Sequence, residues 1–267
     1  MNSFSKTLMP VLLGLFFISG SVFVSSCKKD EPVKITDSLD LPEPGTGAIT
    51  MKFKNTCNGT NLILDFKKYL NANGDTFQVS SFNYYISNLV FNKTDGTKFI
   101  EKESYHLIKA EDDKTWEFTM LNVPPGEYNS VNFLIGVDSA RNVSGAQTGA
   151  LDPAQGMFWT WSTGYIMAKM EGTSSSSPAG GNTIAYHIAG FEGKENGIKP
   201  VTITFPSPLV VSGGVAKKFV LRAELDTWFG PPNVIDFATH PTVVTLNATS
   251  NQIAVNYSKM FTFSAFE

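Results

Sequence analysis

Residues able to bind a soft or borderline metal ion are few in this chain of 267 residues, which has three histidines and two cysteines. His106, His187 and His240 each lie on or beside a predicted strand, where a lone histidine is more often structural than a ligand. Met157 and Cys57 belong to a small pool of sulfur donors that suit copper better than calcium or magnesium. Any imidazole site must therefore draw on a very short list of residues.

Two tryptophans lie close together in the segment Gly156-Met157-Phe158-Trp159-Thr160-Trp161. Because Trp159 and Trp161 are two positions apart, the period of a strand puts both side chains on one face. The simpler interpretation is a core cluster, since tryptophan buries a large apolar area. The alternative is a site in which an indole ring itself takes part in chemistry. A loop precedes this segment, and loops on a rigid β scaffold often carry functional residues.

Sequence motifs of the common enzyme classes are absent from the chain. It has no GxSxG motif, no glycine-rich phosphate loop and no HExxH motif. No nucleophile–base pair or carboxylate dyad has a defined spacing, and the acidic residues lack EF-hand spacing. The net charge of -3 gives no basic surface for nucleic acid. We therefore expect a protein that is not an enzyme and does not bind nucleic acid.

The first 26 residues have the features of a bacterial lipoprotein signal peptide. An apolar run from Leu8 to Val24 follows Lys6 and is short for a membrane-spanning helix. Val24-Ser25-Ser26-Cys27 resembles a lipobox, in which Cys27 is diacylated after cleavage. The alternative is an ordinary signal peptide in which the cysteine falls by chance. We expect an outer membrane lipoprotein, on the periplasmic side or at the cell surface, held to the membrane by its lipid anchor.

Residues 27–47 are expected to form the lipidated cysteine and a polar tether, and residues 48–267 a single folded domain. Apolar and polar residues alternate repeatedly in the domain, as in Ile49 to Phe53 and Phe77 to Phe91, which predicts half-buried strands. Asp95-Gly96 follows the second run at a spacing typical of a hairpin.

Turn residues separate the many short apolar runs of the domain. This pattern predicts an all-β, antiparallel β-sandwich-like single domain with long loops and at most a short C-terminal helix. The helix is expected within residues 250–261, with Ser250 as its cap. Two loops, 138–158 and 172–182, are longer than a compact sandwich needs. Cys57, the only free thiol left once Cys27 is lipidated, is expected to be buried, with metal ligation as the alternative.

Several segments resemble, in the expected order, motifs of the MbnP-like copper-binding family. They include GVDSARN at 136–142, GALDP at 149–153, GMFWTWSTGY at 156–165 and YHIAGF at 186–191. The resemblance covers about residues 48–266 and implies an envelope protein with a β-rich fold. It also implies one copper ion bound by histidines and by a tryptophan that has been oxidised to kynurenine. The oxidation is implied to be performed by a partner di-haem cytochrome c peroxidase-type protein, so that this chain is a substrate and not an enzyme.

Site residues follow from the resemblance one position at a time. Trp159 and Trp161 match the paired tryptophans of the family, and Trp159 is preferred as the oxidised residue. His187 matches the family's histidine and is the first candidate ligand. His106, on a matching strand, is the second candidate, and Met157 is a further one.

Other positions have less direct roles. Some relatives have a histidine near Asn55, which this chain lacks. Asp138 and Asn142 are expected to cap and brace the long loop, with hydrogen bonding to the metal ligands as the alternative. The rival functional hypothesis is a non-enzymatic module that binds glycans or proteins at the cell surface through exposed aromatic residues such as Trp228.

Overall fold

The computed structural model describes residues 43–267 except 146 and 160–163. The predicted signal peptide, the lipidated Cys27, most of the tether and Trp161 lie outside the described residues. Within the described part of the chain, no helix is both long enough and apolar enough to cross a membrane.

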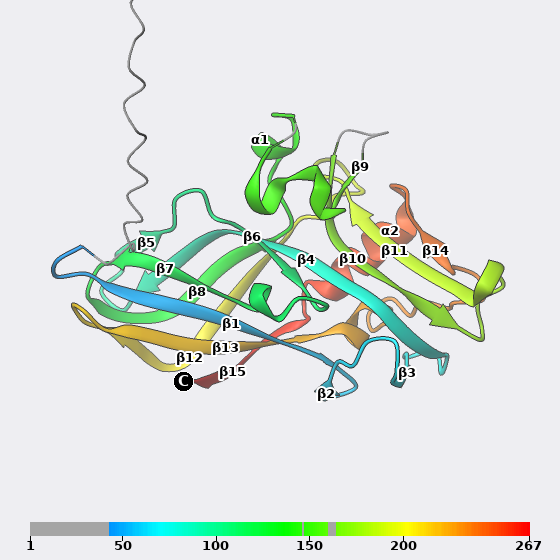
Figure 1. Ribbon diagram of the computed structural model, residues 1–267, viewed down its shortest axis with the longest axis horizontal. Coiled ribbons are helices and arrows are strands. Elements are labelled where there is room, and N and C mark those ends of the chain that lie inside the picture. Colours follow the sequence, from blue (N-terminus) through cyan, green and yellow to red (C-terminus); the bar gives the residue numbers. More distant parts are fainter. Residues whose placement is uncertain (1–42, 146, 160–163) are drawn as a thin grey trace, which may run out of the picture. The chain divides into compact units, whose positions relative to one another are not determined.

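The described residues form two β-sheets (Figure 1). The five-stranded sheet contains, in order, β15 (Phe261–Phe266), β13 (Ala216–Glu224), β1 (Gly47–Cys57) and β2 (Thr60–Asn61), and β7 (Glu117–Val123) also pairs with β1. The ten-stranded sheet has the order β12 (Lys199–Val211), β8 (Gly126–Ile135), β4 (Thr76–Lys93), β10 (Gly164–Ser174), β11 (Thr183–Ala189) and β14 (Thr242–Val243). Beside this path, β3 (Lys68–Leu70), β5 (Lys98–Ile100) and β6 (Tyr105–Lys109) pair with β4, and β9 (Phe158–Trp159) pairs with β10. The helices are α1 (Ser139–Asn142) and α2 (Ala248–Tyr257), and short 3₁₀ turns lie at Asp113–Thr115 (η1), Gly149–Leu151 (η2), Pro153–Gln155 (η3), Gly180–Asn182 (η4) and Leu225–Phe229 (η5).

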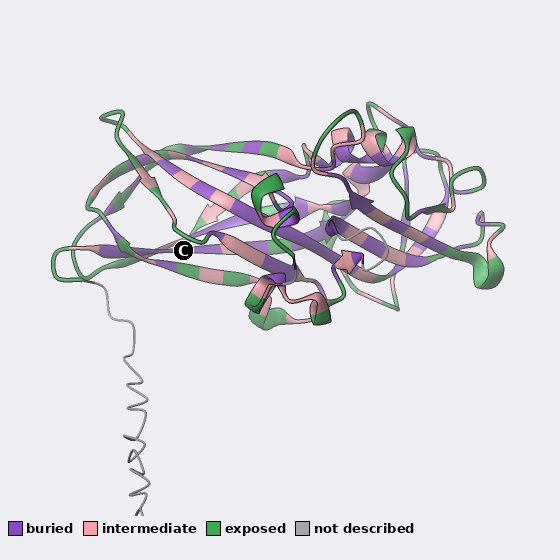
Figure 2. Ribbon diagram, turned by 90° about the horizontal axis from the view of Figure 1, so that it is seen from above, coloured by how far each residue is buried: buried purple, intermediate pink, exposed green. Residues whose placement is uncertain are grey.

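The two sheets face each other and enclose the main core. Phe53 of β1 meets Tyr84 of β4 edge-on across the space between the sheets, with ring centroids 5.9 Å apart. Phe219 of β13 and Phe91 of β4 make a second such contact at 6.2 Å. Buried residues run along the middle of the strands, while the turns are exposed (Figure 2). The prediction of an all-β sandwich-like domain from alternating residues is confirmed.

Strand direction differs from the prediction at two places. β1 runs parallel to β13, with Met51 opposite Phe219, and β11 runs parallel to β14 over two residues. Alternation with period two is the same for parallel and antiparallel strands, so it predicts which residues are buried but not which way a strand runs. Strands far apart in the sequence are free of the hairpin geometry that would impose the antiparallel direction.

The C-terminal helix forms, but its boundaries differ from those predicted. Asn247 is the cap, since its side chain accepts from the backbone N–H of Ser250 at 2.8 Å. Ser250 is the third helical residue, and its hydroxyl accepts in return from the backbone N–H of Asn247 at 3.1 Å. This reciprocal pair is a capping box, and either partner satisfies the sequence preference for a polar cap. Phe261 begins β15 and is not part of the helix.

A second apolar cluster covers the face of the ten-stranded sheet that points away from the five-stranded sheet. We call this face the outer face and the opposite one the inner face. In β4, Tyr84 belongs to the main core and the next residue, Tyr85, to the second cluster, as alternation requires. The second cluster, called the loop cluster below, consists of Tyr85, Leu107, Val137, Leu151, Met157, Trp159, Tyr165, Ile166, Met167 and Ala189.

The predicted long loop 138–158 covers the part of this outer face that carries the loop cluster (Figure 1). It is built from α1 and two 3₁₀ turns, η2 and η3. Tyr85 and Tyr165 rise from the sheet and donate to the backbone carbonyls of Ala150 and Leu151, at 3.0 and 2.7 Å. These bonds satisfy carbonyl groups at the end of a short helical turn, which would otherwise lack partners in a buried place.

Candidate metal centre

Trp159 is held beside the start of β10 by the two-residue strand β9. It lies opposite Gly164 in the ladder, and its neighbour Phe158 lies opposite Tyr165. The rings of Phe158 and Tyr165 meet edge-on at 5.0 Å. Trp159 is 7% exposed and packs in the loop cluster. Trp161, its predicted partner, lies outside the described residues, so the expected shared face of the pair stays a prediction.

His187 lies on the outer face of the sheet, in β11. It is directly opposite Lys169 of β10, whereas the residues on either side of it, Tyr186 and Ile188, belong to the main core. The structure brings His187 and Trp159 to the same place. They line a pocket of about 600 Å³, called the outer pocket below, together with Val244 and Thr245.

A carboxylate that was not among the predicted site residues contacts His187. Glu171 of β10 has Oε1 2.7 Å from Nε2 of His187. The hydrogen bond from His187 lowers the pKa of Glu171 below its ordinary value, with burial acting in the opposite direction. An ionised carboxylate can only accept, so Nε2 of His187 donates to it, and in a neutral imidazole this arrangement leaves the lone pair on Nδ1. In the sequence Glu171 is one of 24 Asp and Glu residues, and only the strand register reveals its partner.

His106 has a similar carboxylate partner in a different environment. Its Nε2 lies 2.9 Å from a carboxylate oxygen of Glu101. Its ring also stacks flat on Phe118 of the five-stranded sheet, with centroids 3.5 Å apart and planes 1° from parallel. His106 is therefore packed between a carboxylate and an aromatic ring, and it is not among the residues that line the outer pocket.

The strand register places the two histidines on opposite faces of the sheet. Directly opposed residues on neighbouring antiparallel strands share a face. His106 is opposite Ile86, which is in the main core, so His106 points to the inner face. His187 is opposite Lys169, whose two sequence neighbours are both in the main core, so His187 points to the outer face. Because the sheet lies between them, one ion cannot bind both imidazoles in this arrangement.

Met157 lies directly before β9 and is fully buried in the loop cluster. Its backbone carbonyl accepts from the N–H of Ile166 at 2.9 Å, which fixes the chain just ahead of Trp159. The thioether packs among apolar side chains and is not among the residues that line the outer pocket.

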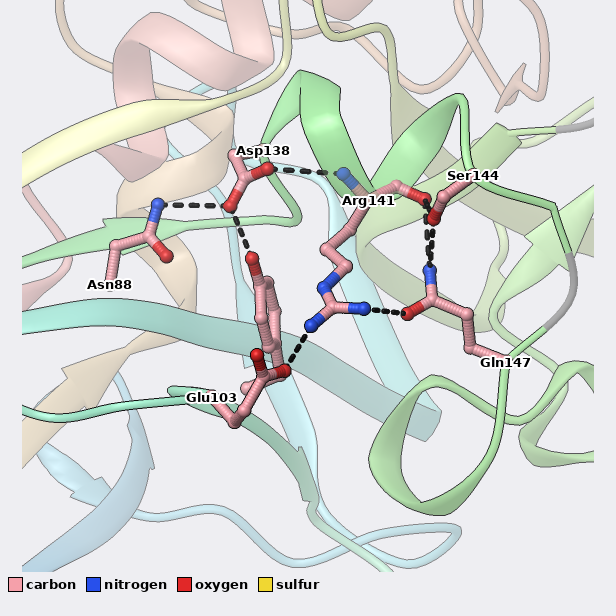
Figure 3. Close-up of polar contacts among 7 residues, drawn as sticks. Asn88, Glu103, Asp138, Arg141, Ser144 and Gln147 are labelled. Carbon is pink, nitrogen blue, oxygen red and sulfur yellow. Dashed lines mark hydrogen bonds and ion pairs between the residues drawn. The ribbon is translucent and has the colours of Figure 1, made fainter.

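Asp138 caps α1 and connects the long loop to the sheet (Figure 3). Its carboxylate accepts from the backbone N–H of Arg141 at 3.2 Å, from the Asn88 amide at 3.0 Å and from the Tyr105 hydroxyl at 2.5 Å. Burial alone would raise the pKa of Asp138, but these hydrogen bonds lower it below the ordinary value. For Tyr105, burial and the Asp138 contact raise the pKa to about 12. The predicted cap is confirmed.

Arg141 extends the same network across the surface of the loop (Figure 3). Its guanidinium donates to Gln147 at 3.1 Å, pairs with Glu103 and lies over the ring of Tyr105 at 5.5 Å. These contacts give the guanidinium polar or aromatic partners on several sides. The network therefore serves to fix the loop above the sheet.

Asn142 braces the loop from inside, as predicted. It is 2% exposed, and its amide nitrogen donates to the carbonyls of Val137 and Asp138. Its amide oxygen accepts from the backbone N–H of Tyr165 at 2.9 Å, at the start of β10. One side chain thus connects the beginning of the loop to the strand that carries Lys169 and Glu171.

Cys57, His240 and Trp228, which the sequence also offered as candidates, do not line the outer pocket. Cys57 is a free, fully buried thiol, as expected, and burial raises its pKa, which disfavours the thiolate. His240 is exposed, and its Nδ1 lies 2.9 Å from the hydroxyl of Thr239. Trp228, named for the glycan-binding hypothesis as an exposed aromatic, is completely buried and donates to the Met260 sulfur at 3.2 Å.

The donor set at the outer pocket matches copper in type but is small. Within the described residues, no group of three or more His, Cys, Asp or Glu side chains is placed to hold a metal ion. Among the described residues that line the pocket, His187 has an imidazole and Thr245 a hydroxyl, while Glu171, which is not among the lining residues, contacts the imidazole. A neutral imidazole nitrogen suits copper.

Comparisons with known proteins agree on one family. The MbnP family model matches residues 46–262. Among solved structures, the fold is similar to that of "MbnP from Methylosinus trichosporium", with a TM-score of 0.52 and 12% identity, over 76% of this chain and 83% of that one. No curated protein matches the chain. At this identity the structural likeness shows the fold alone, whereas the family model spans most of the chain. The chain belongs to the MbnP family.

Proposed function

We propose that this chain is a lipid-anchored envelope protein that binds one copper ion at the outer pocket. In this proposal His187 supplies an imidazole nitrogen and Trp159, oxidised to kynurenine, supplies a second donor. Cys27 carries the anchor, and the tether holds the domain away from the outer membrane. The role is copper scavenging or handling, without an enzymatic activity of its own.

One observation carries this proposal: His187 and Trp159 line the same pocket in a chain that belongs to the MbnP family. They come from separate motifs in the sequence and meet only because β9 and β11 both neighbour β10. Imidazole is a donor that copper prefers, and the scarcity of other ligands leaves few competing sites. The shared pocket with His187 supports Trp159 as the modified residue, and Trp161 lies outside the described residues.

The oxidation converts an apolar ring into a pair of donors. Two oxygen atoms from two peroxide molecules add across the pyrrole double bond of the indole and open the ring, with two water molecules released. Hydrolysis of the resulting formamide releases formate and leaves kynurenine, a net gain of about 4 Da. The product has an aromatic amine and a ketone, which indole lacks. A di-haem cytochrome c peroxidase-type partner performs the oxidation in this proposal, with the present chain as its substrate.

The proposal is tested by titrating the mature protein, purified from its native envelope, with Cu(I) and with Cu(II). We expect about one ion per chain for the wild type and a stoichiometry near zero for His187→Ala. His240→Ala is the matched control, because this histidine is exposed and does not line the outer pocket. A wild type that takes up no copper, or an uptake that His187→Ala leaves unchanged, contradicts the proposal.

Intact-mass spectrometry of the same protein tests the modification and the anchor together. We expect the acyl mass at Cys27 and an increase of about 4 Da that disappears in Trp159→Phe. Trp116→Phe is the control, because the Trp116 indole donates to the Lys109 carbonyl at 2.8 Å, away from the outer pocket. An unmodified wild type would show that His187 binds copper, if at all, without kynurenine. The rival glycan-binding hypothesis gains no support from Trp228, which is buried.

A further inference from the structure

Glu171 and His187 form a diagonal pair on the outer face of the sheet. In the β10–β11 ladder, His187 is opposite Lys169 and Glu171 is opposite Ala185. Glu171 therefore lies two residues along β10 from the position opposite His187, on the same face. Long side chains can contact each other across this diagonal. Oε1 of Glu171 and Nε2 of His187 are 2.7 Å apart, the distance of a charge-assisted hydrogen bond.

The backbone fixes Glu171 at this position. The next residue, Gly172, lies against β4 so closely that a Cβ atom there would be 2.0 Å from the carbonyl oxygen of Gln78. The β10–β4 register shifts between Glu171 and Gly172. A glycine is required for this close approach, so the sequence Glu171-Gly172 sets where the carboxylate leaves the strand.

We propose that Glu171 is a positioning residue for His187, which holds the imidazole by its Nε2–H so that Nδ1 is the nitrogen available to the outer pocket. The inference rests on the proposed function, because the ligand it prepares is the copper ligand. A carboxylate on the second nitrogen of a metal-binding histidine fixes the orientation and tautomer of the ring and increases its basicity. Here the ring is held on one side by Glu171 and adjoins Trp159 across the pocket.

The protein contains its own control for this inference. Glu101 contacts Nε2 of His106 in the same way, at 2.9 Å, but on the inner face of the sheet. Removal of Glu101 deletes a carboxylate–imidazole contact of the same kind without touching the outer pocket. A general loss of stability from deleting such a contact is thereby separated from a specific effect on His187.

The test uses the full mature protein, labelled with ¹⁵N and first studied without metal. We expect a hydrogen-bonded Nε2–H proton of His187, shifted downfield and slow to exchange with water, assigned by its absence from His187→Ala. It should be lost in Glu171→Ala, retained in Glu101→Ala and retained in Glu171→Gln, whose amide oxygen still accepts. Titration with Cu(I) alone should then show an affinity 10- to 100-fold lower for Glu171→Ala, with Glu101→Ala unchanged and Glu171→Gln largely recovered.

Two outcomes overturn the inference. One is a His187 Nε2–H signal that is the same in Glu171→Ala as in the wild type. The other is an equal loss of Cu(I) affinity in Glu171→Ala and Glu101→Ala, which would indicate a general effect on folding. If Glu171→Ala does not fold, Glu171→Gln decides, since loss of both the proton signal and the affinity there contradicts a role as hydrogen-bond acceptor. A wild type that shows the proton but binds no Cu(I) contradicts the proposed function and not the Glu171–His187 contact.

Discussion

Two imidazole–carboxylate pairs in this domain have almost the same local geometry and very different surroundings. In both, Nε2 lies within 2.9 Å of a glutamate oxygen, and the histidine side chains are 21% and 20% exposed for His106 and His187. His106 is on the inner face and is stacked on Phe118, whereas His187 is on the outer face and adjoins a pocket. The two histidines thus have similar partners, and what distinguishes the structural role of His106 from the proposed ligand role of His187 is the layer of residues that covers each ring.

The largest expected difference between the pairs is in copper binding. His187→Ala should abolish uptake, an effect of at least about 100-fold in affinity, because it removes the proposed imidazole ligand. His106→Ala should leave the affinity within about twofold, because the sheet separates it from the outer pocket. Competition titration with a Cu(I) chelator measures both. Equal losses in the two variants would break the comparison.

Folding stability should rank the same two variants in the opposite order. We expect His106→Ala to lower the free energy of unfolding by about 2 kcal/mol, because it deletes a hydrogen bond to a carboxylate and an aromatic stack. His187→Ala should cost less than about 1 kcal/mol, because Glu171 is 39% exposed and water can replace the lost partner. Urea denaturation of the metal-free protein measures the two values. A larger loss for His187→Ala would show that the outer pair is also structural.

The stability of the loop that covers the loop cluster should depend on Asp138 more than the stability of the main core does. Asp138→Ala removes the α1 cap and the partner of Tyr105 and Asn88, and we expect a loss of about 1 kcal/mol. Hydrogen exchange should accelerate in residues 138–158 and remain unchanged in β1 and β13. Asp138→Asn, which keeps a capping oxygen, serves as the milder variant. Uniform acceleration in both sheets would indicate that the loop and the main core unfold together.

The smallest expected effect is the pH dependence of this loop. The pKa of Asp138 is lower in the folded protein than its ordinary value of 3.8, so the carboxylate stabilises the fold above that value. This contribution is lost as the pH falls below 3.8 and passes through the lowered pKa. Because Asp138 is only partly buried, solvent screening keeps the effect below about 1 kcal/mol. The stability difference between wild type and Asp138→Asn should therefore shrink in acid, as measured by urea denaturation across the acid range.

Much of the fold could be predicted from the sequence, because burial imposes a visible pattern. Alternation located β4 and the start of β1, and Asp95-Gly96 marks the hairpin between β4 and β5. The parallel pairing of β1 with β13 could not be predicted, since it depends on strands far apart in the chain. The sequence also did not show that Asn247, and not Ser250, caps the helix, because the side chain of each residue accepts a hydrogen bond from the backbone N–H of the other.

Two residues of the outer pocket, His187 and Trp159, could be predicted from the sequence, whereas their arrangement and the partner Glu171 could not. His187 and Trp159 were named from motifs, and the structure places them at one pocket. The face on which His106 lies depends on its pairing with Ile86, which the segment around it does not reveal. Glu171 could be recognised only from the β10–β11 register. The sequence shows the type of each side chain. The face on which a side chain lies, and its diagonal neighbour on the next strand, are set only when the strands pair into a sheet.

The ten-stranded sheet is a partition between two independently packed sets of apolar residues, the main core and the loop cluster. A change of volume or chemistry on the outer side can be absorbed by the loop, because it does not require the main core to repack. The main core can therefore fold first, and a side chain of the loop cluster can be altered chemically afterwards without disturbing it.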